Sequence, residues 1–329
     1  MSDRRKLIIA LGASALSVPF AFAQQQNKVW RIGYLDFGFR KATMDSGRYA
    51  AFIDGLRELG YVEGRNLAIE ARFAEGNTDR LNEYAAELVR QKVDLLLTAG
   101  SETNLAVRRA TTTIPVIVIA TADPVHDGYA ASLARPGSNF TGMTNGQVDT
   151  VQKLVELLTV AAPKLKRVAV LTTPTSYSGP AMLLQVQAAA GQMGKQIVPI
   201  YARTPEEIER GFATMVRERI DAIVILANAF MLAQRAQIAA LAFKHRLPSI
   251  YPQWSYAEAG GLMSYGADTN DNARRAGIFV DKILKGTKPG DIPFEQPTRY
   301  YLVINRKTAN ALGIKLTSEL LTRADRVIE

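Results

Sequence analysis

The residues best suited to chemistry in this sequence lie in two polar loops, each directly after an apolar run. Residues 121–129 read Thr-Ala-Asp-Pro-Val-His-Asp-Gly-Tyr and follow the apolar run at 115–120. Residues 99–104 read Ala-Gly-Ser-Glu-Thr-Asn and follow the apolar run at 93–98. Open α/β sheets bind small ligands at the carboxyl ends of their parallel strands, where such loops stand. The two loops therefore predict one wall of a ligand-binding cleft.

Residue patterns typical of catalysis or metal binding are missing from the sequence. The chain has two histidines, His126 and His245, and no cysteine, which argues against a zinc site. It has no Gly-x-Ser-x-Gly nucleophile motif, and residues 191–196 lack the Ser or Thr that follows Lys in a phosphate-binding loop. We predict a protein that is not an enzyme and that holds no metal and no cofactor.

The elements that would position these loops alternate between apolar strands and amphipathic helices. Apolar residues recur at helical spacing over residues 49–59, whereas residues 220–226 form the near-continuous apolar run of a parallel strand covered on both faces. The alternation begins again after residue 145, which predicts two lobes of similar βαβ build. Two further predictions are a short helical run at 130–134 and a terminal helix at 317–328.

The first 23 residues have the composition of a secretory signal peptide. Residues 4–6 are positively charged, an apolar stretch follows, and Ala-Phe-Ala at 21–23 is a cleavage pattern. A membrane anchor needs about 20 apolar residues, and this stretch is shorter and interrupted by Gly12 and Pro19. We predict export to the periplasm with cleavage after Ala23, by either the general or the twin-arginine route.

Composition and charge narrow the class of partner. The 329 residues are 47% hydrophobic and 22% charged, an ordinary globular composition. The formal net charge is +9, and removal of residues 1–23, which hold three positive and one negative side chains, leaves +7. Lys and Arg are spread along the chain, with no basic run longer than residues 4–6 and no basic–aromatic stripe. We therefore expect no nucleic-acid partner.

Several short sequence segments, which are specific when they occur together, are spread along the chain. They are residues 55–61, 63–66, 123–125, 132–137 (with Asn139, Thr141 and Gly142), 258–266 and 320–329. Through them the chain resembles the solute-binding proteins of bacterial ABC importers whose better-described members take aromatic amino acids. The resemblance implies the α/β fold of type I periplasmic binding proteins. In that fold, two Rossmann-like lobes with parallel sheets are joined by three crossing strands.

The resemblance also implies discontinuous lobes. Lobe 1 would comprise residues 24–143 and 262–292, and lobe 2 would comprise residues 144–261 and 293–329. The expected function is that of a periplasmic, monomeric solute-binding component, which closes around an aromatic amino acid and delivers it to an ABC permease in the inner membrane. Three alternatives stay open: a binder of aromatic carboxylates, a ligand sensor for a membrane kinase or chemoreceptor, and an exported enzyme.

The resemblance places the ligand-binding residues at strand ends in both lobes. The candidates are Tyr34, Asp36, Ser101, Asp123, Thr173, Ser176, Tyr177, Asn228, Trp254 and Tyr265. Asp123 would accept from a ligand ammonium group, loop hydroxyls and backbone N–H groups would bind a carboxylate, and Trp254, Tyr265 or Tyr34 would stack on a ring. In these loops Glu102 and residues 126–129 are more polar than the family pattern.

Structural roles compete with six of these ten assignments. Asp123 precedes a proline and could cap a turn. Ser101 and Ser176 could be helix N-caps, Tyr34 and Tyr265 could pack within a lobe, and Trp254 could be hinge packing.

Overall fold

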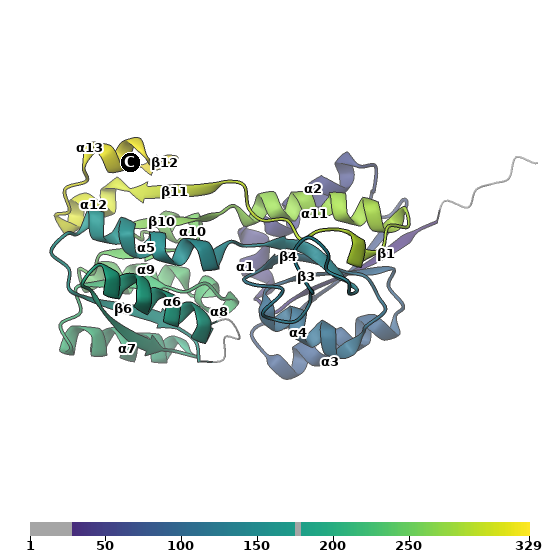
Figure 1. Cartoon of the computed structure of the whole chain (residues 1–329), viewed down its shortest axis with the longest axis horizontal. Coiled ribbons are helices and arrows are strands. Elements are labelled where there is room, and N and C mark those ends of the chain that lie inside the picture. Colours follow the sequence, from purple (N-terminus) through teal and green to yellow (C-terminus); the bar gives the residue numbers. More distant parts are fainter. Residues whose placement is uncertain (1–27, 175–178) are drawn as a thin grey trace, which may run out of the picture.

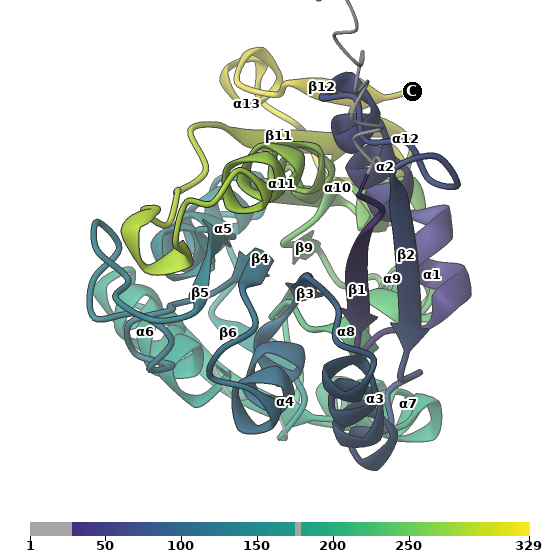
Figure 2. The ribbon, with the colours of Figure 1, turned by 90° about the vertical axis from the view of Figure 1, so that its right-hand side faces the viewer.

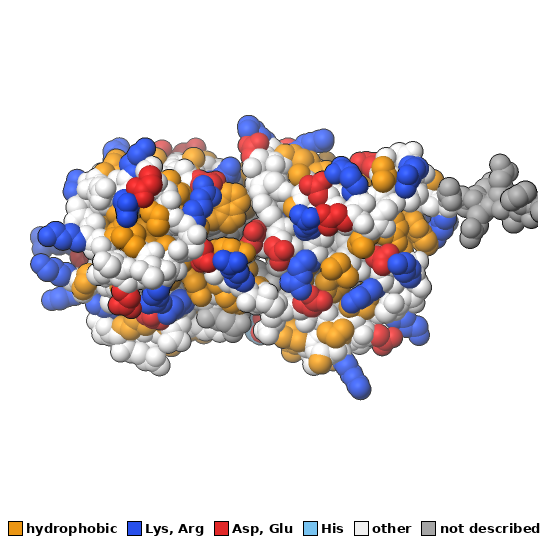
Figure 3. Space-filling model, turned by 90° about the horizontal axis from the view of Figure 1, so that it is seen from above, with side chains coloured by type: hydrophobic (Ala, Val, Ile, Leu, Met, Phe, Trp, Pro, Cys, Tyr) orange, Lys and Arg blue, Asp and Glu red, His pale blue; other side chains and the backbone are white. Residues whose placement is uncertain are grey.

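The computed structural model describes residues 28–174 and 179–329, which form two lobes lying side by side (Figure 1). The predicted signal peptide, residues 1–23, lies outside the described residues. Within the described ranges, no helix combines the length and the apolar character needed to span a membrane. Seen from above, the lobes meet at a waist, and side chains of both charges are intermixed over this face (Figure 3).

Lobe 1 is built on a five-stranded sheet whose neighbouring strands are all parallel. The strand order is β2-β1-β3-β4-β5. The strands are β1 (Trp30–Asp36), β2 (Leu67–Phe73), β3 (Leu95–Ala99), β4 (Val116–Thr121) and β5 (Phe140–Thr144). All five residues of β3 are buried, as expected of a parallel strand covered on both faces.

Helices cover both faces of this sheet (Figure 2). They are α1 (Arg40–Asp45), α2 (Arg48–Glu58), α3 (Thr78–Arg90), α4 (Ser101–Ala110) and, from much later in the chain, α11 (Thr269–Leu284). α11 lies against α2 because two glycines permit close approach. A Cβ at Gly55 would lie 2.1 Å from the Arg274 carbonyl oxygen, and one at Gly277 would lie 2.8 Å from the Gly55 carbonyl carbon.

Lobe 2 is built on a seven-stranded sheet in the order β12-β11-β10-β9-β8-β6-β7. The strands are β6 (Arg167–Thr172), β7 (Gln196–Tyr201), β8 (Ala222–Ile225), β9 (Ser249–Tyr251), β10 (Met263–Ala267), β11 (Tyr300–Asn305) and β12 (Arg326–Ile328). Its pairs are parallel except β10 with β11, which run antiparallel. The predicted α/β architecture with two parallel-strand sheets is confirmed.

The helices of lobe 2 follow its strands in alternation. They are α5 (Gln147–Ala161), α6 (Gly179–Gln192), α7 (Pro205–Arg217), α8 (Ala229–Ala233), α9 (Arg235–Lys244), α10 (Trp254–Glu258), α12 (Arg306–Leu312) and α13 (Ser318–Thr322). In α7 the sequence fixes where the helix begins. Thr204 caps it by accepting from the Glu207 N–H at 3.3 Å, and a proline occupies its first turn. A short 3₁₀ turn (Pro289–Asp291) follows α11.

Three connections pass between the lobes, after β5, between β10 and α11, and before β11. The first and third are tied together. The Glu295 N–H donates to the Gly142 oxygen and the Thr144 N–H donates to the Glu295 oxygen, both at 2.9 Å. The predicted return to lobe 1 at residue 262 is too early, because β10 is hydrogen bonded to β9 and β11 in the sheet of lobe 2.

Two local predictions are wrong. Residues 130–134 form no helix; Ser132 Oγ instead accepts from the Arg135 N–H at 3.1 Å, and the Ala131 N–H donates to the Pro136 oxygen at 2.9 Å. The predicted terminal helix ends at Thr322, and the last residues form β12, which pairs with β11. At residues 130–134 a local turn replaces the helix, whereas at the C-terminus longer-range pairing outweighs local helical preference.

Candidate ligand-binding site

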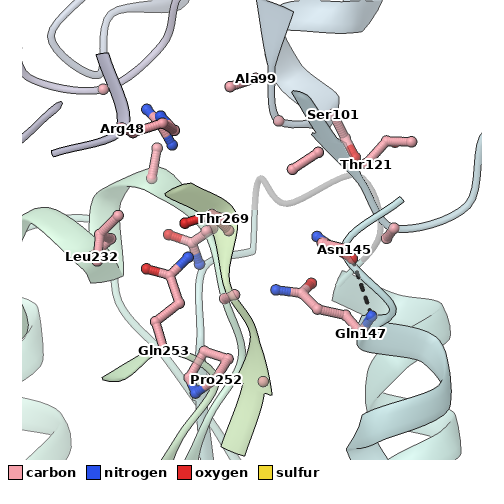
Figure 4. Close-up of a pocket in the computed structure, with 18 of the residues that line it drawn as sticks. Arg48, Ala99, Ser101, Thr121, Asn145, Gln147, Leu232, Pro252, Gln253 and Thr269 are labelled. Atoms are coloured by element: carbon pink, nitrogen blue, oxygen red, sulfur yellow. Dashed lines mark hydrogen bonds between the residues drawn. The ribbon is translucent and has the colours of Figure 1, made fainter. Parts of the chain in front are cut away.

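A cavity of about 100 Å³ lies between the two lobes. A water needs roughly 10–15 Å³ measured in this way, so the space suits a small molecule. Much of the wall consists of Gly and Ala, and both lobes contribute polar side chains (Figure 4). These are Asp36, Thr43, Arg48, Ser101, Glu102, Thr121, Asn145, Gln147, Thr150, Asn228, Gln253 and Thr269.

An ion pair between Asp36 and Arg48 forms part of the lobe 1 wall. Asp36 ends β1, and its carboxylate also accepts from the Gly38 N–H at 2.7 Å and from Thr43 Oγ1 at 3.2 Å. Arg48 opens α2 and donates to Asp36 through Nη2. Burial lowers the pKa of Arg48, but the Asp36 charge and the Tyr34 hydroxyl shift it upward overall, so the guanidinium stays charged.

Ser101 and Thr121 form another part of the lobe 1 wall, at the ends of β3 and β4. Both hydroxyls donate to Asp127 Oδ2 at 3.3 Å, and Asp127 is 2% exposed. Burial raises the pKa of the Asp127 carboxyl, although Tyr129, Ser101 and Thr121 each lower it. Burial, together with the neighbouring Asp127 charge, also raises the pKa of the Glu102 carboxyl in the wall.

Two asparagines present fixed donors to the cavity. Asn145 Oδ1 accepts from the Gln147 N–H at 3.0 Å, drawn as the dashed line in Figure 4, which leaves its Nδ2 group for a ligand. Asn228 Oδ1 accepts from the Met231 N–H at 2.8 Å and caps α8. Its Nδ2 is buried and has no partner among the described residues. A carboxylate from a ligand would satisfy such donors.

Three of the predicted site residues line this cavity: Asp36, Ser101 and Asn228. Each stands just beyond a parallel strand, at its carboxyl end or in the loop after it, as the fold rule requires. Ser176 and Tyr177 lie outside the described residues. Thr173 is buried directly after β6 and does not line the cavity.

Asp123 has the competing turn-capping role. Its Oδ1 accepts from the Val125 and His126 N–H groups, each at 3.0 Å, and the residue does not line the cavity. Because Asp and Asn side chains readily bond backbone groups two or three residues ahead, this local use of the carboxylate is common. The structure places Glu102 rather than Asp123 at the cavity wall.

The aromatic candidates also lie elsewhere. Tyr34 is 1% exposed and packs edge-on against Tyr49 in the core of lobe 1, and Tyr265 stacks on Tyr300. Trp254 lines a neighbouring hollow, which shares Phe39 and Ala42 with the cavity. Among the described residues lining the cavity, Phe39 is the aromatic one.

Several lining residues were missed by sequence reasoning. Arg48, Asn145 and Gln147 stand at helix starts and at the first interlobe connection, where no strand-end pattern signals them. Across the described ranges, no group of three or more His, Asp or Glu side chains is placed to hold a metal ion. The arrangement is suited to binding a small polar organic molecule.

Residues 43–328 match the family described as ABC transporter substrate binding protein. A tyrosine-binding protein of Clostridioides difficile is 25% identical over 81% of this chain and 76% of its own length. A solved domain from Streptococcus pneumonia in complex with L-Trp is 26% identical, with a TM-score of 0.84, over 91% of this chain and 99% of that one. A conserved domain protein from Vibrio cholerae has a TM-score of 0.85 at 26% identity, over 91% and 100% of the two chains. The chain belongs to the ABC transporter substrate binding protein family and has the type I periplasmic binding protein fold.

Proposed function

We propose that this chain is the exported solute-binding component of an ABC importer and that its ligand is an aromatic amino acid. The observation that carries the proposal is the composition of the interlobe cavity, where fixed donors and fixed acceptors face the same small space. An α-amino acid carries one group of each kind, an ammonium that donates and a carboxylate that accepts.

The donors suit a carboxylate. Arg48 keeps its charge, and the Asn228 amide nitrogen is buried and unpartnered among the described residues. A buried donor without a partner costs about 1–3 kcal/mol, which a bound carboxylate would recover. Hydrogen bonds to an ionised carboxylate are among the stronger ones in proteins.

The aromatic side chain of the proposed ligand is supported by the shape of the cavity wall and by the relatives. Small residues such as Ala99, Ala227 and Gly266 leave room in the wall, and Phe39 offers one ring face. The relatives named above are a tyrosine-binding protein and a structure holding L-Trp. These favour an aromatic amino acid over other zwitterions.

Delivery needs the lobes to open and close. Both lobes wall the cavity, so a bound ligand would hold them together, and the three connections form the hinge. We propose a monomer that binds without chemical turnover and passes its ligand to a membrane permease.

A thermal-shift screen of the purified protein against amino acids, aromatic acids, sugars and inorganic anions tests the ligand class, because a ligand bound only by the folded state raises the melting temperature. We expect shifts with Phe, Tyr or Trp. Shifts with sugars or anions alone would reject the proposal. Uptake assays in a gene-deletion strain separate an importer, which loses uptake, from a sensor, which does not.

A further inference from the structure

Asp127 lies directly behind the cavity wall rather than in it. It is 2% exposed, and the two hydroxyls that reach it, Ser101 Oγ and Thr121 Oγ1, belong to residues that line the cavity. Figure 4 shows Ser101 and Thr121 together on one side of the cavity and Arg48 on the other. The chain thus places a buried carboxylate behind two residues of the wall, within hydrogen-bond distance of their hydroxyls.

This contact fixes the polarity of the two hydroxyls. A hydroxyl has one proton to donate, and an ionised carboxylate can only accept. Since Ser101 and Thr121 both donate to Asp127 Oδ2, their oxygens retain only acceptor capacity for a ligand. A ligand carboxylate cannot donate to them, whereas an ammonium group can.

The charges around this side of the cavity act in the same direction. Asp36 is neutralised by Arg48, but among the described residues no Lys or Arg forms an ion pair with Glu102 or Asp127. Arg108 donates to the backbone oxygen of Asp127, at 2.9 Å, and not to its carboxylate. The charge of His126 lowers the pKa of Asp127, but without a Lys or Arg ion pair among the described residues the two carboxylates still favour a positively charged ligand group.

We propose that Ser101, Thr121 and Glu102 form an ammonium subsite and that Asp127 is the positioning residue that makes the two hydroxyls acceptors. The inference rests on the proposed function and makes it more specific: the ligand must carry a protonated amine. Aromatic acids without an amine should bind much more weakly than the matching amino acid.

Three compounds with the same ring test the subsite by calorimetry: L-tyrosine, tyramine, which lacks the carboxylate, and 3-(4-hydroxyphenyl)propionate, which lacks the amine. For the wild-type protein we expect L-tyrosine to bind most tightly and the propionate at least about tenfold more weakly, the scale for a hydrogen bond to a charged group. A propionate that binds as tightly as L-tyrosine would overturn the inference and leave the solute-binding role standing.

Thr121→Val removes one acceptor at nearly constant shape, and Thr98→Val is its matched control. Thr98 is a buried threonine in β3 that donates to Asn104 Oδ1 at 2.6 Å and does not line the cavity. We expect Thr121→Val to weaken L-tyrosine and tyramine about tenfold while the propionate is unchanged. Equal losses for all three compounds, or equal effects of the two variants, would show a merely structural role.

Asp127→Asn tests the positioning role through selectivity. Loss of the negative charge should lower the ratio of tyramine to propionate affinity by about tenfold. Simple destabilisation would lower the melting temperature and leave that ratio unchanged, which would refute the role. L-lysine separates the failure of the subsite from the failure of the proposed aromatic ligand. Suppose that the wild type binds none of the three aromatic compounds but binds L-lysine, and that Thr121→Val weakens this binding. The aromatic part of the proposed function then fails, and the ammonium subsite stands.

Discussion

Asp36 and Arg48 form an ion pair in the cavity wall, with side chains that are 2% and 14% exposed. The Asp36 carboxylate also accepts hydrogen bonds from the Gly38 N–H and from Thr43 Oγ1. Such a pair is sensitive to the loss of one member, because the remaining charge stays buried without its partner. It therefore couples the stability of lobe 1 to the geometry of the site.

Asp36→Ala should lower the free energy of unfolding by about 3–5 kcal/mol, the range for breaking a buried ion pair. Urea denaturation measures this. Asp54→Ala is the control, since Asp54 pairs with Arg57 at the surface, where both side chains are more than half exposed, and its loss should cost less than about 1 kcal/mol. Equal losses for the two variants would contradict the importance of the buried pair.

Asn228→Asp should separate ligand binding from folding. The aspartate keeps the oxygen that caps α8 but replaces the cavity-facing donor with an acceptor, so affinity for an amino acid should fall by about 1.5–3 kcal/mol. Calorimetry gives the affinity and thermal denaturation gives the stability. Asn77→Asp, at the equivalent cap of α3, keeps its own bond to the Arg80 N–H and should leave affinity unchanged. Retained affinity in Asn228→Asp would remove this residue from the site.

The carboxyls of Glu102 and Asp127 should make the ligand-free protein respond to pH. Burial raises their pKa values above the ordinary 4.5 and 3.8. The folded state therefore keeps these two carboxyls protonated to higher pH than the unfolded state does. Their contribution to stability is complete below the ordinary pKa values and is lost as pH rises through the raised ones. His126, whose charge lowers the pKa of Asp127, acts in the opposite direction.

Glu102→Gln isolates one of the two groups. Its free energy of unfolding minus that of the wild type, both from urea denaturation, should increase as pH rises from about 4 through the raised pKa of Glu102, because only the wild type loses the contribution of this carboxyl. Over the same interval tyramine affinity should rise in the wild type, because the subsite becomes more negative, and should rise less in the variant. A difference in stability that is independent of pH would refute the assignment.

Gly146→Ala should disturb the first connection between the lobes. Gly146 has a φ of +61°, and a Cβ there would lie 2.1 Å from the Tyr300 hydroxyl oxygen, on a ring that stacks against Tyr265. Gly137→Ala is a matched control, with a φ of +68° and no atom within 4 Å of the added Cβ. The control should cost about 1–2 kcal/mol from backbone conformation alone. Gly146→Ala should lower the free energy of unfolding, measured by urea denaturation, clearly more than Gly137→Ala does. Equal losses for the two variants would show that Tyr300 moves aside freely.

Much of the fold was predictable because it follows from local patterns. The apolar run at 220–226 contains β8, and the helical periodicity over 49–59 corresponds to α2, Arg48–Glu58. The exceptions are places where distant partners decide the structure. β12 forms because β11 offers it an edge, and the boundary at residue 262 is displaced because β10 pairs within lobe 2.

The candidate site was predictable only where topology fixes it. Asp36, Ser101 and Asn228 follow parallel strands and line the cavity, whereas Asp123 has a similar position but turns its carboxylate to its own loop. Arg48 reaches the cavity from the start of a helix, through its pairing with Asp36. A residue whose place depends on a side-chain partner leaves no periodic signal in the sequence.

The central claim, that this chain binds an aromatic amino acid between its lobes, is tested most directly by isothermal titration calorimetry of the wild-type protein with L-tyrosine, L-tryptophan and L-phenylalanine. The account predicts saturable binding of at least one of them at one molecule per chain, because one interlobe cavity holds one ligand. Heat from a sugar or an inorganic anion, with none from the three amino acids, would contradict it.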